Sequence, residues 1–286
     1  YKSDATNIEN LLLLGSAHLN LKNHSEALFF FQQGLKVDPQ CGECLSNLGN
    51  VLKELGDSQG AVNCYLKAIK LKPRFSDAYQ NLATVYAESG RITQAIETFK
   101  MALVNKPNCA SSHSNLGVMY KVQGNLSEAK KSFLEAIRID PENAVSWSNL
   151  GGIFKEQADI KSAISYYMEA IRLEPRFADA YSNLGACLKE AGKTEEAKRA
   201  FETAISLRPD FALAHSNMAT IYFDEGKIGK AVKSFKLAIQ LESNFPDAYV
   251  NLGNAYRAQN KLDEAITCFR MALRLKADHP HAFCNL

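Results

Sequence analysis

The sequence predicts an all-α fold, a right-handed superhelical solenoid of 34-residue helical hairpins. Three observations predict it: an asparagine, an alanine and an aromatic residue each recur every 34 residues along the chain. A period of this length is typical of stacked helical hairpins, because a single hairpin cannot bury its apolar face alone. We therefore expect one hairpin per period and a core that is continuous between neighbours.

The repeat boundaries follow when each period is numbered so that the recurring asparagine is position 6. An N-terminal flank at residues 1–7 then precedes eight repeats, and residues 280–286 begin a truncated ninth. The repeats span residues 8–41, 42–75, 76–109, 110–143, 144–177, 178–211, 212–245 and 246–279.

Each element of the hairpin has its own sequence signal. Small residues at positions 8 and 20 let two helices approach closely, and Phe or Tyr at position 24 fills the space between them. Glycine at position 15 of five repeats allows the turn between the helices. Proline at position 32 of six repeats ends the second helix, because it lacks the N–H donor. Trp147, at position 4, is expected in the core, and His113 and His215 at the same position are read as structural.

The recurring asparagines are predicted to lie opposite the core. A helix turns by about 100° per residue, so positions 2, 6, 9 and 13 form one stripe on the first helix, away from the packed positions 4, 7, 8 and 11. We call the residues at position 6 the asparagine ladder: Asn47, Asn81, Asn115, Asn149, Asn183, Asn217, Asn251 and Asn285. Leu13 occupies this position in the first repeat, so we expect the ladder to end there.

A row of primary amides has a specific binding chemistry. An asparagine side chain donates and accepts hydrogen bonds at once, as a peptide bond does. A regular row could therefore hold an extended peptide by its backbone, weakly and with little sequence preference, because each hydrogen bond contributes only about 0.5–1.5 kcal/mol. The alternative, that these asparagines are solvated residues fitting the helix surface, stays open.

Composition excludes other classes of partner. The net charge is +2, from 33 basic and 31 acidic residues, so no strong field favours nucleic acid or an anionic membrane. No apolar run is long enough to span a membrane, and the chain begins without an initiator Met or signal pattern, as expected of a fragment or processed chain. Cys41 and Cys44 form a lone CxxC, read as two small residues at a repeat junction, and no metal site is predicted. The cysteine content is typical of a reducing compartment.

The pattern resembles the tetratricopeptide repeat over residues 8–286. The segments "FSDAYQNL", "FADAYSNL" and "FPDAYVNL", the runs "GNVLKELG", "GACLKEAG" and "GNAYRAQN", and the opening "NLLLLGSAHLNL" narrow the match. They are similar to the repeat region of nucleocytoplasmic protein O-GlcNAc transferases, in particular the plant SECRET AGENT type. This resemblance implies a cytoplasmic and nuclear protein whose ladder holds the backbone of extended or disordered protein segments.

The resemblance also implies roles for acidic residues four positions before the ladder. Asp77, Asp179 and Asp247 would tune substrate choice, with Glu43 as a conservative variant, while Ser111, Val145 and Leu213 depart from the pattern. UDP-GlcNAc is expected only for a catalytic region beyond Leu286. The chain itself shows no catalytic residue pattern and no cofactor site, and a homodimer through the convex face is left open.

Three alternatives remain. A carboxylate-gripping adaptor would need Lys at position 5, where the second to eighth repeats have Ser, Gln or Val, so the sequence argues against it. The sequence does not exclude a non-catalytic scaffold for protein-complex assembly. The repeat region of the O-fucosyltransferase SPINDLY is a third alternative, disfavoured because its repeats are interrupted whereas these keep a strict 34-residue period.

Overall fold

The computed structural model describes residues 7–286, and every regular element in that range is an α-helix. The first helix of each repeat covers positions 1–13, and the second covers positions 17–30. The first helices are α1 (Ile8–Asn20), α3 (Gly42–Glu54), α5 (Ser76–Glu88), α7 (Ala110–Val122), α9 (Ala144–Glu156), α11 (Ala178–Glu190), α13 (Ala212–Asp224) and α15 (Pro246–Ala258). The second helices are α2 (His24–Val37), α4 (Ser58–Leu71), α6 (Ile92–Asn105), α8 (Leu126–Ile139), α10 (Ile160–Leu173), α12 (Thr194–Leu207), α14 (Ile228–Leu241) and α16 (Leu262–Leu275). A short helix, α17 (Pro280–Asn285), follows.

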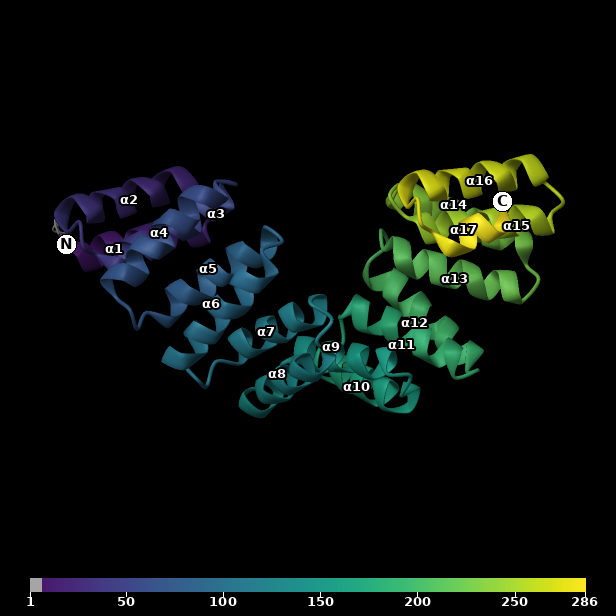
Figure 1. Cartoon of the computed structure of the whole chain (residues 1–286), viewed down its shortest axis with the longest axis horizontal. Coiled ribbons are helices and arrows are strands. Elements are labelled where there is room, and N and C mark those ends of the chain that lie inside the picture. The colour runs from purple at the N-terminus through teal and green to yellow at the C-terminus, as the bar shows by residue number, and fades with distance from the viewer. Residues whose placement is uncertain (1–6) are drawn as a thin grey trace. The chain divides into compact units, whose positions relative to one another are not determined.

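The all-α hairpin prediction is confirmed, and Figure 1 shows the helices following one another in antiparallel pairs. The chain forms two compact units, one ending at Ser146 and the other beginning at Trp147. In the first unit, the hairpins α1/α2, α3/α4, α5/α6 and α7/α8 pack in sequence, with α2 against α3, α4 against α5 and α6 against α7. In the second unit, α10 packs on α11, α12 on α13, α14 on α15 and α16 on α17.

The turn inside each hairpin requires a left-handed residue at position 15. Gly56 has φ 85°, and four other glycines occupy this conformation in other repeats. Lys22, Ala158 and Asn260 adopt it with φ of 57°, 60° and 59°. Glycine does so without steric cost, whereas a Cβ atom is disfavoured there. The backbone geometry of the turn is thus the same in all eight hairpins, although the sequence signal is present in only five.

In three of the eight repeats the residue that precedes the second helix caps a free N–H group of that helix with its side chain. Asp57 Oδ1 accepts from the Gly60 amide at 2.8 Å. Asp159 Oδ1 accepts from the Ser162 amide at 3.1 Å. These are N-caps, which stabilise a helix by about 1 kcal/mol each.

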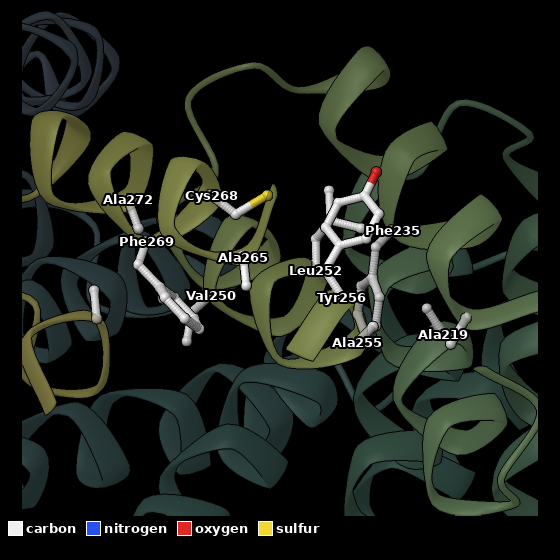
Figure 2. Close-up of a cluster of buried hydrophobic side chains, with 12 residues drawn as sticks. Ala219, Phe235, Val250, Leu252, Ala255, Tyr256, Ala265, Cys268, Phe269 and Ala272 are labelled. Carbon is white, nitrogen blue, oxygen red and sulfur yellow. The ribbon is translucent and has the colours of Figure 1, made fainter. Parts of the chain in front are cut away.

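The core of each hairpin is an aromatic ring packed onto a small residue of the facing helix. The ring at position 24 is buried in every repeat: Phe31, Tyr65, Phe99, Phe133, Tyr167, Phe201, Phe235 and Phe269. A Cβ atom added to Gly117 would lie 2.7 Å from the Phe133 ring, which explains the small residue at position 8. Figure 2 shows Phe235, Tyr256 and Phe269 within one such cluster, together with alanine and aliphatic side chains.

Trp147 corrects one expectation about this core. Its side chain is half-buried and not enclosed, and its ring lies 5.6 Å from that of Tyr166. The interior of the hairpin belongs to the ring at position 24, so position 4 lies at the edge of the packed region.

Candidate functional site

The asparagine ladder lies along the first helices, and all eight side chains are half-buried. In the first unit it comprises Asn47, Asn81 and Asn115, and in the second Asn149, Asn183, Asn217, Asn251 and Asn285. Within each unit the first helices of neighbouring repeats contact one another, as α3 contacts α5 and α11 contacts α13. Successive asparagines are therefore neighbours on one surface, and the adjacent helices cover part of each side chain.

Six ladder side chains have no hydrogen-bond partner among the described residues. They are Asn47, Asn115, Asn149, Asn183, Asn217 and Asn251. Each amide keeps two N–H donors and a carbonyl acceptor free for a ligand. A half-buried amide without a protein partner has lost part of its hydration and gained no hydrogen bond in exchange. A ligand that supplies both a donor and an acceptor would therefore bind favourably to it.

The other two ladder side chains are held by an asparagine at position 9 of the preceding repeat. Asn81 Nδ2 donates to Asn50 Oδ1 at 3.0 Å. Asn285 Nδ2 donates to Asn254 Oδ1 at 3.2 Å, and Arg257 donates to Asn285 Oδ1 at 3.4 Å. The ladder is therefore not uniform, which the 34-residue pattern alone does not predict.

The acidic residues at position 2 are mostly paired within their own repeat. The pairs are Glu43 with Lys72, Asp179 with Arg208, and Asp247 with His279, the last at 3.0 Å between Oδ1 and Nε2. The hydrogen bond from the Lys72 ammonium holds the pKa of Glu43 below its usual value. Asp77 is exposed and has no ion pair or hydrogen bond among the described residues. Of the four predicted selectivity residues, Asp77 has the least compensated charge.

Ion pairs also run between neighbouring repeats, from a lysine at position 12 to an acidic residue at position 13 of the next repeat. Lys53 Nζ lies 3.6 Å from Glu88 Oε1, and Lys189 Nζ lies 2.9 Å from Asp224 Oδ2. Lys189 also donates to Thr220 Oγ1 at 2.9 Å. The acidic bias of the first helices is therefore partly neutralised by lysines of the preceding repeat.

Two cavities open beside the ladder at equivalent places in the two units. The cavity in the first unit has a volume of about 110 Å³ and is lined by Thr84, Ala87, Glu88, Phe99, Asn115, Val118 and Met119. The one in the second unit has a volume of about 270 Å³ and is lined by Lys189, Thr220, Phe223, Asp224, Phe235, Asn251 and Asn254. Six lining positions are shared, so the repeat itself builds a side-chain-sized hollow next to a ladder amide.

The histidines at position 4 have a structural role, in agreement with the sequence. His113 Nε2 lies 3.0 Å from the carbonyl oxygen of Pro107, and His215 Nε2 lies 2.9 Å from that of Pro209. Each ring thus bonds the proline that ends the preceding repeat.

The CxxC pair differs from its interpretation as two unlinked small residues. The structure pairs Cys41 with Cys44, with the sulfur atoms 2.50 Å apart and the Cα atoms 5.3 Å apart. Cys41 Sγ also lies 3.1 Å from the Cys44 amide at the start of α3. Because spacing alone does not separate packing from pairing, the sequence could not decide between them.

The described residues contain no cluster of three or more His, Cys, Asp or Glu side chains suited to a metal ion. Among the helices of residues 7–286, none is long and apolar enough to cross a membrane.

The fold and this surface define a helical-hairpin repeat protein with a row of asparagine amides along its first helices. Models of the tetratricopeptide repeat match residues 8–41, 76–109, 110–143, 144–177, 178–211 and 246–279, and a related model matches residues 49–90 and 219–257. The chain belongs to the tetratricopeptide repeat family.

Two relatives are similar to this chain over a limited segment. A probable UDP-N-acetylglucosamine–peptide N-acetylglucosaminyltransferase SEC of Arabidopsis thaliana is 40% identical over 66 residues, 23% of this chain and 7% of that protein. The UDP-N-acetylglucosamine–peptide N-acetylglucosaminyltransferase of Caenorhabditis elegans is 40% identical over 61 residues, 21% of this chain and 5% of that protein. The matched segment is thus a small part of each relative.

Solved structures show the same fold at low identity. A chain of the APC/C hetero-tetramer Cut9–Hcn1 superposes with a TM-score of 0.75 at 16% identity, covering 92% of this chain and 52% of that one. Pseudomonas aeruginosa pilF superposes with a TM-score of 0.64 at 24% identity, covering 74% of this chain and 97% of that one.

Proposed function

We propose that this chain is the protein-docking array of a protein O-GlcNAc transferase, in which the asparagine ladder holds the backbone of extended protein segments. The observation that carries the proposal is the set of six half-buried ladder amides without a partner among the described residues. Helical repeat arrays present extended concave surfaces to protein partners, and on this proposal the ladder amides line such a surface.

Backbone recognition matches the chemistry of the ladder. A peptide bond offers one donor and one acceptor, and a primary amide can satisfy both, whatever the peptide side chains are. Each hydrogen bond contributes about 0.5–1.5 kcal/mol, while ordering a peptide residue costs about 1–2 kcal/mol. The expected binding is weak for one repeat and accumulates along the array. The cavities beside Asn115 and Asn251 are large enough for one side chain each, and Asp77 adds a local preference for basic residues.

The enzymatic part of the proposal rests on the two relatives named as N-acetylglucosaminyltransferases acting on peptides. On this proposal, a catalytic region in the same protein transfers N-acetylglucosamine from UDP-GlcNAc to Ser or Thr of cytoplasmic and nuclear proteins. The array then brings substrate to it, without holding the sugar nucleotide itself.

Peptide binding by the isolated chain tests the docking role. A panel of fluorescein-labelled, unstructured peptides of unrelated sequence is titrated with the parent, and with a variant carrying Asn183→Ala, Asn217→Ala and Asn251→Ala. Three lost hydrogen bonds at about 0.5 kcal/mol each weaken binding by roughly tenfold or more. The reduction is expected for all peptides alike, because the backbone is the recognised group.

A matched control replaces three exposed asparagines outside the ladder, Asn63, Asn108 and Asn244, by Ala. This control is expected to bind like the parent, and both variants to keep the parent's helical circular dichroism. If the ladder variant also binds like the parent, the docking proposal fails and the scaffold alternative takes its place. A parallel assay on the longer protein, comparing UDP-GlcNAc with a fucosyl donor, separates the two transferase alternatives.

A further inference from the structure

One ladder asparagine is connected to the hydrophobic core by a chain of hydrogen bonds. The Tyr65 hydroxyl donates to Asn50 Oδ1 at 2.7 Å, and Asn81 Nδ2 donates to the same oxygen at 3.0 Å. Tyr65 is fully buried, whereas Asn50 and Asn81 are half-buried. The chain therefore runs from the interior of the second repeat to the ladder position of the third.

This connection occurs in one repeat because it needs two uncommon residues together. Position 24 is Tyr only at Tyr65 and Tyr167, and the other six repeats have Phe. Position 9 is Asn only at Asn50 and Asn254. In the repeat of Tyr167, position 9 is Gly152, which has no side-chain amide. The second repeat alone combines the buried hydroxyl with the position-9 amide.

The buried hydroxyl fixes the direction of the chain of hydrogen bonds. Burial raises the pKa of Tyr65, so its hydroxyl keeps its proton. A buried O–H group without an acceptor is unfavourable, so the hydroxyl must donate, and Asn50 must present its carbonyl oxygen to it. The same oxygen then requires Asn81 to present an N–H group. If both amides were reversed, the Tyr65 proton would lose its acceptor.

We infer that Tyr65 and Asn50 are positioning residues that preorganise Asn81, so that hydrogen bonds reaching the buried core hold its amide in a fixed orientation toward an extended peptide. The inference rests on the proposed peptide-docking function and adds to it a place where binding is strongest and the backbone register is set. Asn81 Nδ2 uses one N–H for Asn50 and retains the other, together with Oδ1. A ladder amide that lacks such a pair of hydrogen-bonded neighbours must lose its rotational freedom when it binds a peptide, whereas the Asn81 amide is already ordered.

The experiment compares five proteins with the parent, using anisotropy of one labelled unstructured peptide. They are Asn81→Ala, Asn50→Ala, the double variant of these two, Tyr65→Phe, and Tyr167→Phe as the matched control. Phe is the residue of six other repeats at position 24, so both tyrosine variants are expected to fold. We expect Asn50→Ala and Tyr65→Phe each to weaken binding by about two- to tenfold, and Tyr167→Phe to leave it unchanged.

The double variant separates positioning from direct contact. If Asn50 acts through Asn81, adding Asn50→Ala to the Asn81→Ala variant does not weaken peptide binding further. If Asn50→Ala still weakens peptide binding in the Asn81→Ala variant, the inference is overturned, because Asn50 would then contact the peptide or support the fold. The side-chain amide signal of Asn81 in ¹⁵N-edited spectra, assigned by its disappearance in Asn81→Ala, should move in Tyr65→Phe and not in Tyr167→Phe.

Failure of this inference is distinguishable from failure of the docking proposal. If Asn81→Ala weakens binding while Asn50→Ala and Tyr65→Phe do not, positioning is refuted and peptide docking stands. If Asn81→Ala binds the peptide like the parent, Asn81 is not a peptide contact and the inference falls with it.

Discussion

Replacing Phe201 by Ala tests the account of the core directly. The ring is completely buried and packs with Leu188, Met218 and Ile221. A Cβ atom placed on Gly185 would lie 2.7 Å from this ring, so the opposing helix touches it and cannot fill the space that it leaves. Removal of a buried phenylalanine costs about 3–5 kcal/mol, and the rigid helical backbone at Gly185 favours the upper part of that range.

The cost is measured as the change in the free energy of unfolding in a urea titration followed by circular dichroism. In a repeat array each repeat is stabilised by its neighbours, so the transition is also expected to broaden or split at the sixth repeat. Phe29→Ala is the control, because that ring is 50% exposed, and the expected cost is below about 1 kcal/mol. A loss for Phe201→Ala no larger than that for Phe29→Ala would refute the assignment of position 24 as the core of the hairpin.

Four further outcomes are expected. Ala158→Gly should raise the melting temperature, with a gain of about 1 kcal/mol, because Ala158 has φ 60° and glycine relieves that strain; an unchanged or lower melting temperature would contradict the turn geometry. Lys72→Gln should reduce the drop in the free energy of unfolding between pH 7 and pH 3, measured in urea titrations. Lys72 lowers the pKa of Glu43, so the ion pair stabilises the fold at pH values above the ordinary carboxyl pKa of 4.5. This stabilisation is lost as the pH falls through the lowered pKa of Glu43. Trp147→Ala should cost about 2 kcal/mol in unfolding free energy, roughly half the value for an enclosed aromatic, because its side chain is half-buried. Backbone amides of residues 280–286 should exchange faster than those of α15, since α17 has only six residues and packs mainly on α16; slow exchange in residues 280–286 would contradict this expectation.

The hairpin architecture was predictable because it depends on residues that must recur. Position 20 is Ala and position 24 is aromatic in every repeat, and both positions are buried each time. Periodicity therefore identifies both the elements and their facing surfaces. The turn at Ala158 was less visible, because the left-handed conformation there is imposed by the flanking helices and not by a glycine.

The candidate site was predictable in position and not in detail. Helical geometry placed the ladder away from the core, yet it could not show that adjacent repeats leave its side chains half-buried. The partners of Asp179 and Asp247 lie 29 and 32 residues away, so their pairing depends on how the repeat closes on itself. The hydrogen bonds from Tyr65 through Asn50 to Asn81 depend on two residues that occur together only in the second repeat, a tyrosine at position 24 and an asparagine at position 9. That combination is the sequence signal that could have revealed them.

The ion pairs between positions 12 and 13 make the array divisible into whole repeats. Excision of residues 178–211 would place Lys155 one repeat before Asp224, so a lysine would again precede an acidic residue across the new junction. Asn149 would then be followed by Asn217, and the row of amides would shorten by one step without changing its spacing. The length of the array therefore changes in fixed increments of one repeat. On the proposed docking function, the number of repeats sets how many residues of a bound segment the ladder can span.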